Sequence, residues 1–375
     1  GKLAWNFVAE DVHDFVWGAD KNYVHTRLEM DEGPTLHFFY LDEPDLKDNW
    51  ERLPEFTARI FEFASANFGK YPYPQYSVIQ GGDGGMEYPM ATLITGKRKL
   101  SSLVGVTVHE AMHEWYQSVL ATNEGLYPWM DEGFCTFTSS KVMSHLFNPD
   151  EDTRVGSYYN SYLNLASSGR EEPLYTMADH YNTNYAYGAN SYGKGAVFAA
   201  QLGCIIGNEN LMNGMRRYFE EWKFKHPTPN DFIRVMEKTS GTHLKWYLNY
   251  MLGDEQIDYA IRRVEGNGDK TILELHNEGS MPMPVDIDIL TADSSRKQIH
   301  IPLEIMRNAK PKEEVEDYTV AEDWSWTSPA YFLEVDMPIS EIREIEIDRS
   351  GRMADVNREN NLIEIQADTK IIIAN

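Results

Sequence analysis

Two histidines and two glutamates in this chain are spaced as the ligands and the general base of a hydrolytic metal site. Residues 108–113 read VHEAMH, so His109 and His113 are four positions apart and Glu110 lies between them. Residues four apart project from nearly the same face of an α-helix, so both imidazoles can reach one ion. Glu132, which follows His113 after eighteen intervening residues, can supply a third ligand.

The chemistry that this set favours is that of catalytic zinc. Catalytic zinc has three protein ligands and keeps its fourth position for water, whose pKa the ion lowers to about 7. Glu110 is close enough in sequence to both histidines to accept the proton of that water. A structural zinc is usually closed by four cysteine or histidine ligands, and neither Cys135 nor Cys204 has a CxxC partner.

Two helices must position these side chains. Apolar residues recur at spacings of three, four and one across residues 103–120, which predicts a helix there. Glu132 falls in the first turns of a second predicted helix, residues 129–146, which follows Pro128. A helix, a short loop and a helix would bring Glu132 back to the two histidines.

The rest of the pattern divides the chain into a small sheet, a mainly helical part and an all-β part. Alternating apolar segments predict strands at 23–28, 35–40, 76–80 and 90–94. Helical periodicity predicts helices at 53–68, 103–120, 129–146, 151–167, 192–206, 208–224, 229–239 and 243–252. Short strands typical of a β-sandwich are expected at 272–275, 285–290, 298–303, 330–335 and 342–347. The boundary is expected near 254–268, where Gly266, Gly268 and Asp269 cluster.

Composition narrows the function classes. The chain has 375 residues, of which 42% are hydrophobic, and a formal net charge of −25. This charge argues against a nucleic-acid partner, because nucleic-acid binding needs a basic surface, and it attracts cations such as substrate amines. No run of eighteen apolar residues occurs, so no membrane span is predicted. Two cysteines do not form a disulfide framework, and both are expected to be buried small side chains.

Four motifs resemble, in their order along the chain, the M1 family of zinc aminopeptidases, whose catalytic domain is thermolysin-like (gluzincin). Residues 109–115 (HEAMHEW) and 131–134 (DEGF) resemble the zinc-binding segments of that family. Residues 84–88 (GGMEY) resemble its GxMEN exopeptidase motif. Residues 191–195 (SYGKG) resemble the segment that carries a catalytic tyrosine.

The resemblance implies an α+β fold in two domains. Residues 1–254 would form a thermolysin-like zinc peptidase catalytic domain, with a small mixed sheet and a mainly helical part, and residues 255–375 a C-terminal β-sandwich domain. The first residues resemble the exit strand of a β-rich domain that usually precedes this one, so we expect further domains of the same full-length protein as partners. The resemblance favours an exported bacterial enzyme, periplasmic or secreted, whereas the residues themselves leave the compartment open.

The resemblance also implies a role for each residue of the catalytic set. His109, His113 and Glu132 would hold one zinc ion per chain. Glu110 would act as the general base and would then protonate the leaving amine. Tyr192 would donate a hydrogen bond to the tetrahedral oxyanion, where negative charge develops.

Substrate recognition would fall to the glycine-rich segment. Glu87 would bind the free α-amine of a peptide, because a carboxylate near the metal favours a charged amino terminus and rejects a blocked one. Gly84, Gly85 and Met86 would present their backbone to an extended peptide, since glycine permits close approach.

The chain departs from the family pattern at four places. Tyr88 replaces the asparagine of GxMEN, and residues 117–118 read QS where glycine and asparagine are usual. Asp131 replaces the asparagine before the ligand glutamate, and Ser139 stands where a glutamate is common. These changes leave every metal ligand in place, but they bear on the shape of the pocket for the first residue and on metal affinity.

The sequence therefore predicts a zinc-dependent aminopeptidase, which removes N-terminal amino acids from peptides through a metal-activated water. One alternative is a zinc endopeptidase or another zinc hydrolase, which a comparison of free and N-acetylated peptides would distinguish. A second alternative is a degenerate, non-catalytic binding protein of the same fold, against which the intact ligand set argues. Without the usual flanking domains, we expect this chain alone to bind zinc but to hydrolyse peptides slowly.

Overall fold

The chain folds into two compact units in a computed structural model that describes residues 4–82, 84–148, 154–366 and 370–373. Unit 1 holds the described residues of 1–156 together with Met177–His180 and Met215–Phe232. Unit 2 holds Ser157–Thr176, Tyr181–Gly214 and the described residues of 233–375. Because the two units interleave along the chain, the domain boundary between residues 254 and 255 stays a prediction.

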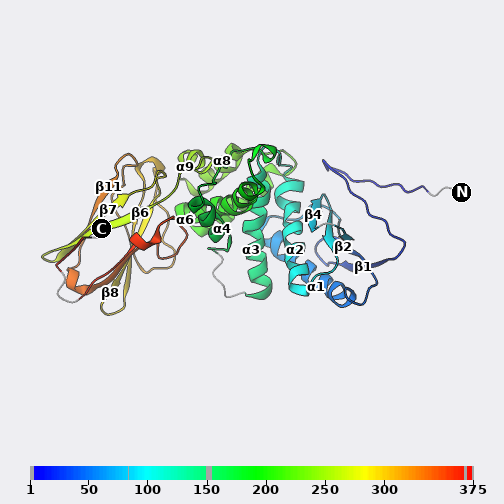
Figure 1. Cartoon of the computed structure of the whole chain (residues 1–375), viewed down its shortest axis with the longest axis horizontal. Coiled ribbons are helices and arrows are strands. Elements are labelled where there is room, and N and C mark those ends of the chain that lie inside the picture. The colour runs from blue at the N-terminus through cyan, green and yellow to red at the C-terminus, as the bar shows by residue number, and fades with distance from the viewer. Residues whose placement is uncertain (1–3, 83, 149–153, 367–369, 374–375) are drawn as a thin grey trace. The chain divides into compact units, whose positions relative to one another are not determined.

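Unit 1 is built on a five-stranded mixed sheet (Figure 1). In spatial order its strands are β1 (Tyr23–Glu29), β2 (Thr35–Leu41), β3 (Gln75–Gly81), β5 (Ala91–Thr95) and β4 (Gly85–Tyr88). β2, β3 and β5 run parallel, whereas β1 pairs antiparallel with β2, and β4 antiparallel with β5. The four strands predicted here are confirmed. The sequence missed edge strand β4, because glycine-rich segments have low strand propensity.

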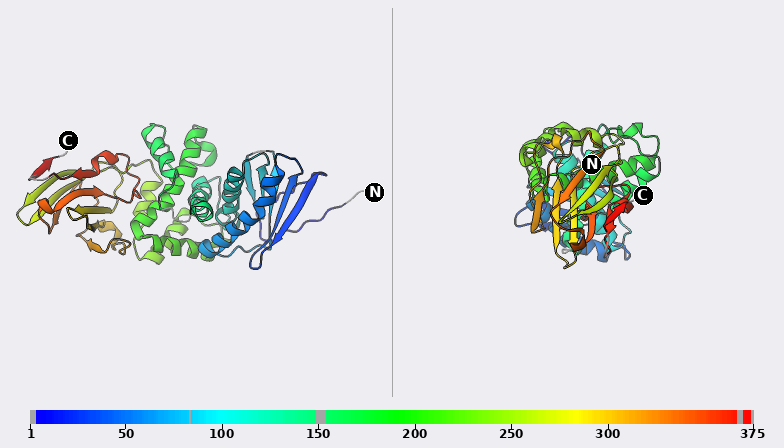
Figure 2. Two further views of the ribbon diagram at one scale, coloured as in Figure 1. Left: turned by 90° about the horizontal axis from the view of Figure 1, so that it is seen from below. Right: turned by 90° about the vertical axis from the view of Figure 1, so that its left-hand side faces the viewer.

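Three helices of unit 1 accompany this sheet, and Figure 2 shows α1 alongside its strands. They are α1 (Lys47–Phe68), α2 (Leu100–His113) and α3 (Phe134–Phe147). A π-helical turn, Glu114–Val119, extends α2, and a second one, Trp129–Gly133, leads into α3. The predicted helices at 103–120 and 129–146 are therefore confirmed. Their π-helical turns were not predicted, and such turns occur frequently at functional sites.

Large aromatic side chains fix these helices in the core of unit 1. Trp50, Trp115 and Trp129 are all completely buried. Trp115 Nε1 also donates a hydrogen bond to the carbonyl of Gly69, the residue after α1, at 2.7 Å. Truncating a buried tryptophan to alanine typically costs about 3–5 kcal/mol, so this packing holds α2 and its extension firmly in place.

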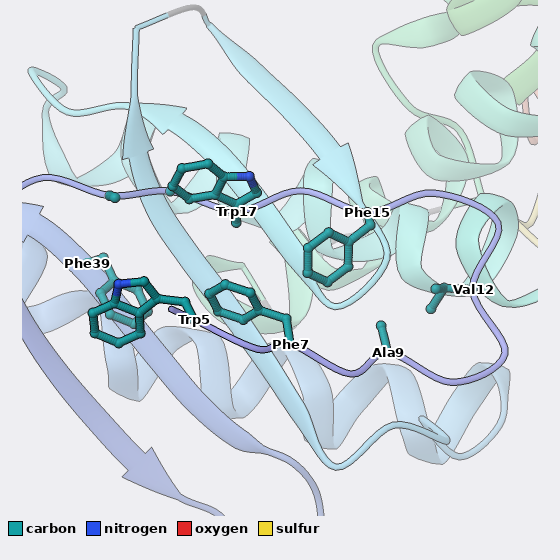
Figure 3. A pocket seen from close by; sticks show the side chains of 9 residues that line it. Trp5, Phe7, Ala9, Val12, Phe15, Trp17 and Phe39 are labelled. Carbon is teal, nitrogen blue, oxygen red and sulfur yellow. The ribbon is translucent and has the colours of Figure 1, made fainter. Parts of the chain in front are cut away.

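The segment before β1, residues 4–22, forms neither a helix nor a strand. It surrounds a cavity of about 1050 Å³ together with β2 (Figure 3). Aromatic side chains dominate the cavity wall: Trp5, Phe7, Phe15, Trp17 and Phe39. Trp5 is 77% exposed and Trp17 65% exposed, so the cavity is widely open. The described residues that line this cavity include no predicted metal ligand and no predicted substrate-binding residue.

Unit 2 combines helices with the β-rich part of the chain. Its helices are α4 (Tyr158–Ser167), α5 (Asn184–Gly188), α6 (Gly195–Ile206) and α9 (Lys245–Met251), while α7 (Asn208–Trp222) and α8 (Pro229–Ser240) have residues in both units. α6 is buried on every side, as its nearly unbroken apolar sequence predicts. Throughout the described residues, no helix is both long and apolar enough to cross a membrane.

One helix begins later than predicted. The predicted helix at 151–167 is wrong at residues 154–157, which are not helical, and α4 begins only at Tyr158. Residues 151–153 lie outside the described part of the chain. Gly156 explains the difference, because glycine is a poor helix former.

Two sheets in unit 2 confirm the predicted β-sandwich (Figure 1). One contains, in spatial order, β10 (Asp317–Val320), β9 (Arg296–Ile301), β8 (Val285–Thr291), β12 (Ile342–Ile347) and β13 (Leu362–Glu364). The other contains β11 (Ala330–Val335), β7 (Lys270–Asn277), β6 (Tyr259–Asn267) and β14 (Ile371–Ile373). β12 contacts β6 between the sheets. The sequence missed β6, β10, β13 and β14.

The glycine cluster that was expected at the domain boundary is a β-hairpin turn. Asn267 pairs with Lys270, so Gly268 and Asp269 form the two-residue turn between β6 and β7. Gly268 has a φ of +65°, which favours glycine and suits such a turn. Glycine and aspartate are common both in domain linkers and in hairpin turns, so the sequence does not distinguish them. The pairing of β6 with β7 identifies this segment as a turn.

Buried charges stabilise the sandwich of unit 2. Asp286 accepts a hydrogen bond from His300 Nδ1 at 2.7 Å and pairs with Lys310 Nζ, and all three residues are buried. Burial by itself raises the pKa of Asp286, but Lys310 and His300 together hold that pKa below its usual range. The ionised carboxyl therefore stabilises the fold above its unfolded pKa of about 3.9, and this contribution is lost as the pH falls through the lower folded pKa.

We expect Asp286→Asn to lower the free energy of unfolding by about 3–5 kcal/mol at pH 7, because the substitution leaves Lys310 buried without its counter-charge. The deficit should shrink in acid, where the wild-type carboxyl is also neutral. Urea unfolding at several pH values measures this. Glu316→Gln is the control, since it breaks an exposed pair with Lys312 at 2.9 Å and should leave the midpoint unchanged. A wild-type midpoint for Asp286→Asn would contradict the assignment.

Candidate active site

Helix α2 and the π-helical turn Trp129–Gly133 bring the three predicted metal ligands together. His109 Nε2 lies 3.1 Å from Glu132 Oε2 and 3.3 Å from His113 Nε2, and the distance from His113 Nε2 to Glu132 Oε2 is 3.4 Å. Donor atoms that bind one ion tetrahedrally at about 2.0–2.1 Å lie about 3.3 Å apart. The triangle therefore has the size that a tetrahedral metal ion needs.

The triangle is buried on one side and open on the other. The His113 side chain is 1% exposed, whereas those of His109 and Glu132 are 24% and 13% exposed. Two imidazoles and one carboxylate, with one accessible side, are the donor set of catalytic zinc, which keeps a position for water. Burial by itself raises the pKa of Glu132, but hydrogen bonds with both histidines hold it well below its usual range, so this donor is ionised.

Asp131 orients the buried histidine. Its Oδ1 accepts a hydrogen bond from His113 Nδ1 at 2.6 Å, so Nε2 of the same ring faces His109 and Glu132. Burial disfavours the charged imidazole, but Cys135 and Asp131 raise the pKa of His113 well above its usual value. Because a metal-bound imidazole must be free of its proton at the donor nitrogen, metal binding here would release a proton.

Glu110, the predicted base, packs against edge strand β4. A Cβ atom on Gly85 would lie 2.1 Å from Glu110 Oε1 and 2.7 Å from Val106 Cγ2, so a larger residue would force the Glu110 carboxylate or its neighbour to move. Burial raises the pKa of Glu110 to about 7, even though His113 and His109 act to lower it. A carboxyl with a pKa near the working pH is suited to accept and return protons.

Glu87, the predicted amine-binding residue, points from β4 toward the metal ligands. Its Oε1 lies 3.9 Å from His113 Nδ1, and its side chain is 10% exposed. Burial raises the pKa of Glu87, His113 opposes the shift, and Asp131 adds to it. The structure therefore places a largely desolvated carboxylate beside the ligand set.

Glu124 joins this group, although sequence reasoning missed it. Carboxylate oxygens of Glu87, Glu124 and Asp131 lie within 4.8 Å of one another. Gln117 Nε2 donates a hydrogen bond to Glu124 Oε2 at 3.3 Å, and both residues line a recess of about 480 Å³. Glu124 lies in the loop between the two predicted ligand segments. The position of a loop side chain cannot be predicted from helical or strand periodicity. The one signal in the sequence was Gln117, which departs from the family pattern.

Glu114 ties the helix that carries the two histidines to the strand that carries Glu87. Its Oε2 accepts hydrogen bonds from the Tyr71 hydroxyl at 3.0 Å and from the backbone N–H of Met90 at 3.1 Å. Met90, with a φ of +63°, lies in the turn between β4 and β5. Burial raises the pKa of Glu114 to about 8, while the hydrogen bonds from Met90 and Tyr71 act to lower it.

The predicted peptide-binding segment forms an exposed edge. β4 pairs with β5 through residues from Gly85 to Tyr88, and no other described strand pairs with its opposite side. Met86 is 42% exposed there. The carbonyl of Gly84 accepts hydrogen bonds from Thr95 and Arg98. This carbonyl is therefore bonded within the protein, whereas it was predicted to face a peptide.

The predicted catalytic tyrosine lies in unit 2. Tyr192 is half-buried in a π-helical turn, Ala189–Lys194. Lys194 is completely buried, where its Nζ pairs with Glu171 and donates to the Gly253 carbonyl at 2.7 Å. Lys194 therefore anchors this turn. Because the predicted metal ligands belong to unit 1, the role of Tyr192 stays a prediction.

Comparison with known families matches residues 54–251 to the Peptidase family M1 domain. This span is more than half of the chain, and it contains every residue to which a catalytic, metal-binding or substrate-binding role is assigned above. The chain belongs to peptidase family M1. The resemblance carried by its four motifs is thereby confirmed.

Curated relatives of this M1 chain are aminopeptidases by name. Probable aminopeptidase 2 of Sulfurisphaera tokodaii is 22% identical over 242 residues, which are 61% of this chain and 27% of that protein. Aminopeptidase B of Homo sapiens is 24% identical over 198 residues, which are 48% of this chain and 30% of that protein. The M1 chain thus spans less than a third of the length of these relatives.

Solved structures share the fold of the M1 chain. Legionella pneumophila aminopeptidase A in complex with aspartic acid aligns with a TM-score of 0.62 at 15% identity and covers 89% of this chain and 38% of its own. A point mutant of an M1 zinc metallopeptidase from Deinococcus radiodurans aligns with a TM-score of 0.50 at 16% identity and covers 61% of this chain and 52% of its own. These alignments confirm the predicted fold class.

We expect Gly85→Ala to slow hydrolysis of an amino-acid amide by about 100-fold, because its methyl group would displace the Glu110 carboxylate by an ångström or more. Gly82→Ala is the matched control in the same segment, where an added Cβ meets nothing within 4 Å. Steady-state rates, circular dichroism and metal content should be compared for both variants. Equal rates for Gly85→Ala and Gly82→Ala would contradict the tight contact between β4 and Glu110.

Proposed function

We propose that this M1 chain is the catalytic part of a zinc-dependent aminopeptidase, which removes single amino acids from the N-terminus of peptides. The observation that carries the proposal is the triangle of His109, His113 and Glu132 donor atoms, whose sides measure 3.1, 3.3 and 3.4 Å. Glu110 beside the triangle supports hydrolysis. Glu87 beside it supports recognition of a free amine.

Zinc fits the donors of the site. Two imidazole nitrogens and one carboxylate oxygen match its preferred ligands, and their separations match its tetrahedral geometry. When bound, zinc would polarise the scissile carbonyl and lower the pKa of a water molecule to about 7. His109, His113 and Glu132 would hold one ion per chain.

Glu110 would move the proton in each half of the reaction. Its raised pKa of about 7 lets the carboxylate accept a proton from the attacking water and return it to the leaving amine near neutral pH. Its contact with Gly85 restricts where the carboxylate can lie. Tyr192 would donate a hydrogen bond to the oxyanion, a role that the family resemblance supports.

Glu87 and Glu124 would together bind the α-ammonium group of the substrate. Their carboxylates lie within 4.8 Å of each other and of Asp131, and burial is the leading cause that raises the pKa of both glutamates. Neighbouring carboxylates in a partly desolvated recess repel one another unless a cation lies between them. A substrate ammonium supplies that charge, whereas an acetylated amine does not.

The exposed side of β4 would bind the backbone of the peptide. An unpaired strand edge offers N–H and C=O groups at the spacing of an extended chain, and many peptides bind proteins by adding a strand in this way. Glu87 lies on the same strand, so the peptide amine and its first carbonyl would be placed by one element. This arrangement favours cleavage at a fixed distance from the amino terminus.

Glu110→Gln should keep bound zinc but lower turnover of an amino-acid amide by about 10²–10⁴-fold, because glutamine cannot accept the proton. Zinc content by atomic absorption and steady-state rates measure the two effects separately. Glu62→Gln, at an exposed position of α1, is the control and should match the wild type. Wild-type turnover by Glu110→Gln would refute the assignment of the base.

Glu87→Gln should weaken recognition of the free amine, with kcat/KM for an unblocked peptide falling about tenfold or more, because a hydrogen bond between charged groups is lost. Rates on matched free and N-acetylated peptides give the selectivity of each variant. We expect Glu124→Gln to show a smaller loss, since Glu124 is the more exposed of the pair. Equal cleavage of both peptides by the wild type would favour an endopeptidase instead.

A further inference from the structure

We propose that Asp131 is a positioning residue of the metal site, which holds His113 in the one tautomer that can bind the ion and whose negative charge sets how tightly the ion is held. Asp131 is not a member of the ligand triangle. Its role rests on the zinc site proposed above and extends that site to a residue on the far side of one imidazole.

Consecutive residues of one turn hold the two nitrogens of His113. Asp131 Oδ1 lies 2.6 Å from Nδ1, and Glu132 Oε2 lies 3.4 Å from Nε2. Both come from the π-helical turn Trp129–Gly133. The side chains of His113 and Asp131 are 1% and 4% exposed, so water has little access to their hydrogen bond. The protein, rather than solvent, therefore sets the orientation of this ring.

A carboxylate specifies the tautomer of His113, whereas an amide does not. An ionised aspartate can only accept hydrogen bonds, so the proton of a neutral imidazole must lie on Nδ1 and the lone pair on Nε2, facing the ligand triangle. An asparagine could also turn its NH₂ group toward Nδ1 and leave the proton on Nε2, where it would block the metal. Asp131 Oδ1, 2.6 Å from Nδ1, therefore favours the tautomer whose Nε2 lone pair faces the ligand triangle.

The charge of Asp131 acts on the ion through the same ring. A carboxylate that accepts from the outer N–H of a metal-bound histidine makes the other nitrogen a stronger donor. Glu87 Oε1 is 3.9 Å from Nδ1, too far for a hydrogen bond, whereas Asp131 Oδ1 accepts one at 2.6 Å, and Cys135 also lies close to both residues. An asparagine is usual at this position in the M1 pattern, so the added charge distinguishes this chain from that pattern.

Two variants of the full chain separate hydrogen bonding from charge. Asp131→Asn keeps the shape and one acceptor oxygen but removes the charge, and Asp131→Ala removes both. Metal-free proteins are titrated with Zn²⁺ against a chromophoric chelator, and the absorption spectrum of bound Co²⁺ reports the geometry of the donors. We expect the Zn²⁺ dissociation constant to rise about 10–100-fold in Asp131→Asn and at least as much in Asp131→Ala, with an altered Co²⁺ spectrum in both.

Asp286→Asn is the matched control. It removes the charge from another buried aspartate that accepts from a buried histidine Nδ1, at 2.7 Å, but its partners in unit 2 are not predicted metal ligands. This control should unfold more easily than the wild type while its Zn²⁺ dissociation constant and Co²⁺ spectrum stay unchanged. A loss of metal affinity in the Asp131 variants alone would then be attributed to the change at Asp131 and not to a general loss of stability.

The outcomes distinguish the role of Asp131 from the proposed function. A wild-type dissociation constant in Asp131→Asn would overturn the role of charge, and wild-type behaviour of both variants would overturn the positioning role. A wild type that binds no Zn²⁺ would instead defeat the zinc site itself. Circular dichroism shows whether each metal-free variant is folded. If Asp131→Ala is not, the isosteric Asp131→Asn decides the question alone.

Discussion

The packing of helix α2 against the turn Trp129–Gly133 is the constraint on which the site depends. His109 and His113 are brought together by helix geometry alone, but two imidazoles do not make a hydrolytic centre. Glu132, the predicted third donor, must return to within 3.4 Å of them across an intervening loop. Trp115 and Trp129 are completely buried, and their packing holds the two segments in place. Glu132 could therefore move away from the histidines only if this packing were disrupted.

A concentration of negative charge is the second feature of the site. Glu87, Glu110, Glu124, Asp131 and Glu132 all approach the two histidines or one another. Charged groups that lose their water are costly to bury unless they meet opposite charges. The protein resolves this by sharing charge with two imidazoles and by raising the pKa values of Glu87, Glu110 and Glu124, mainly through burial. The same surplus of negative charge favours cations, which in the proposed function are a divalent metal and a substrate ammonium.

The hairpin of β4 and β5 is linked at two points to helix α2 and its π-helical extension, and under the proposed function this would couple substrate recognition to catalysis. Gly85 touches the Glu110 carboxylate, and Glu114 accepts a hydrogen bond from Met90 in the turn after β4. Glu110 follows His109 in the sequence and Glu114 follows His113, so each link lies next to a predicted metal ligand. The strand that carries Glu87 is thus positioned by the helix that carries the base, so amine and scissile bond would be placed with respect to one rigid pair of elements.

The sequence by itself determined the two helices and the shared helical face of His109 and His113, because a four-residue spacing on a helix is a local property, and from that spacing it predicted the ligand pair and the base. It also predicted Glu132 from its position after His113, and the substrate role of the glycine-rich segment through its family resemblance. Only the tertiary structure revealed Glu124, edge strand β4 and the hydrogen bond between Asp131 and His113, and only it showed that Gly268 belongs to a hairpin turn. These features depend on which distant segments meet and how deeply they are buried, and neither is encoded in the spacing of residues along one segment.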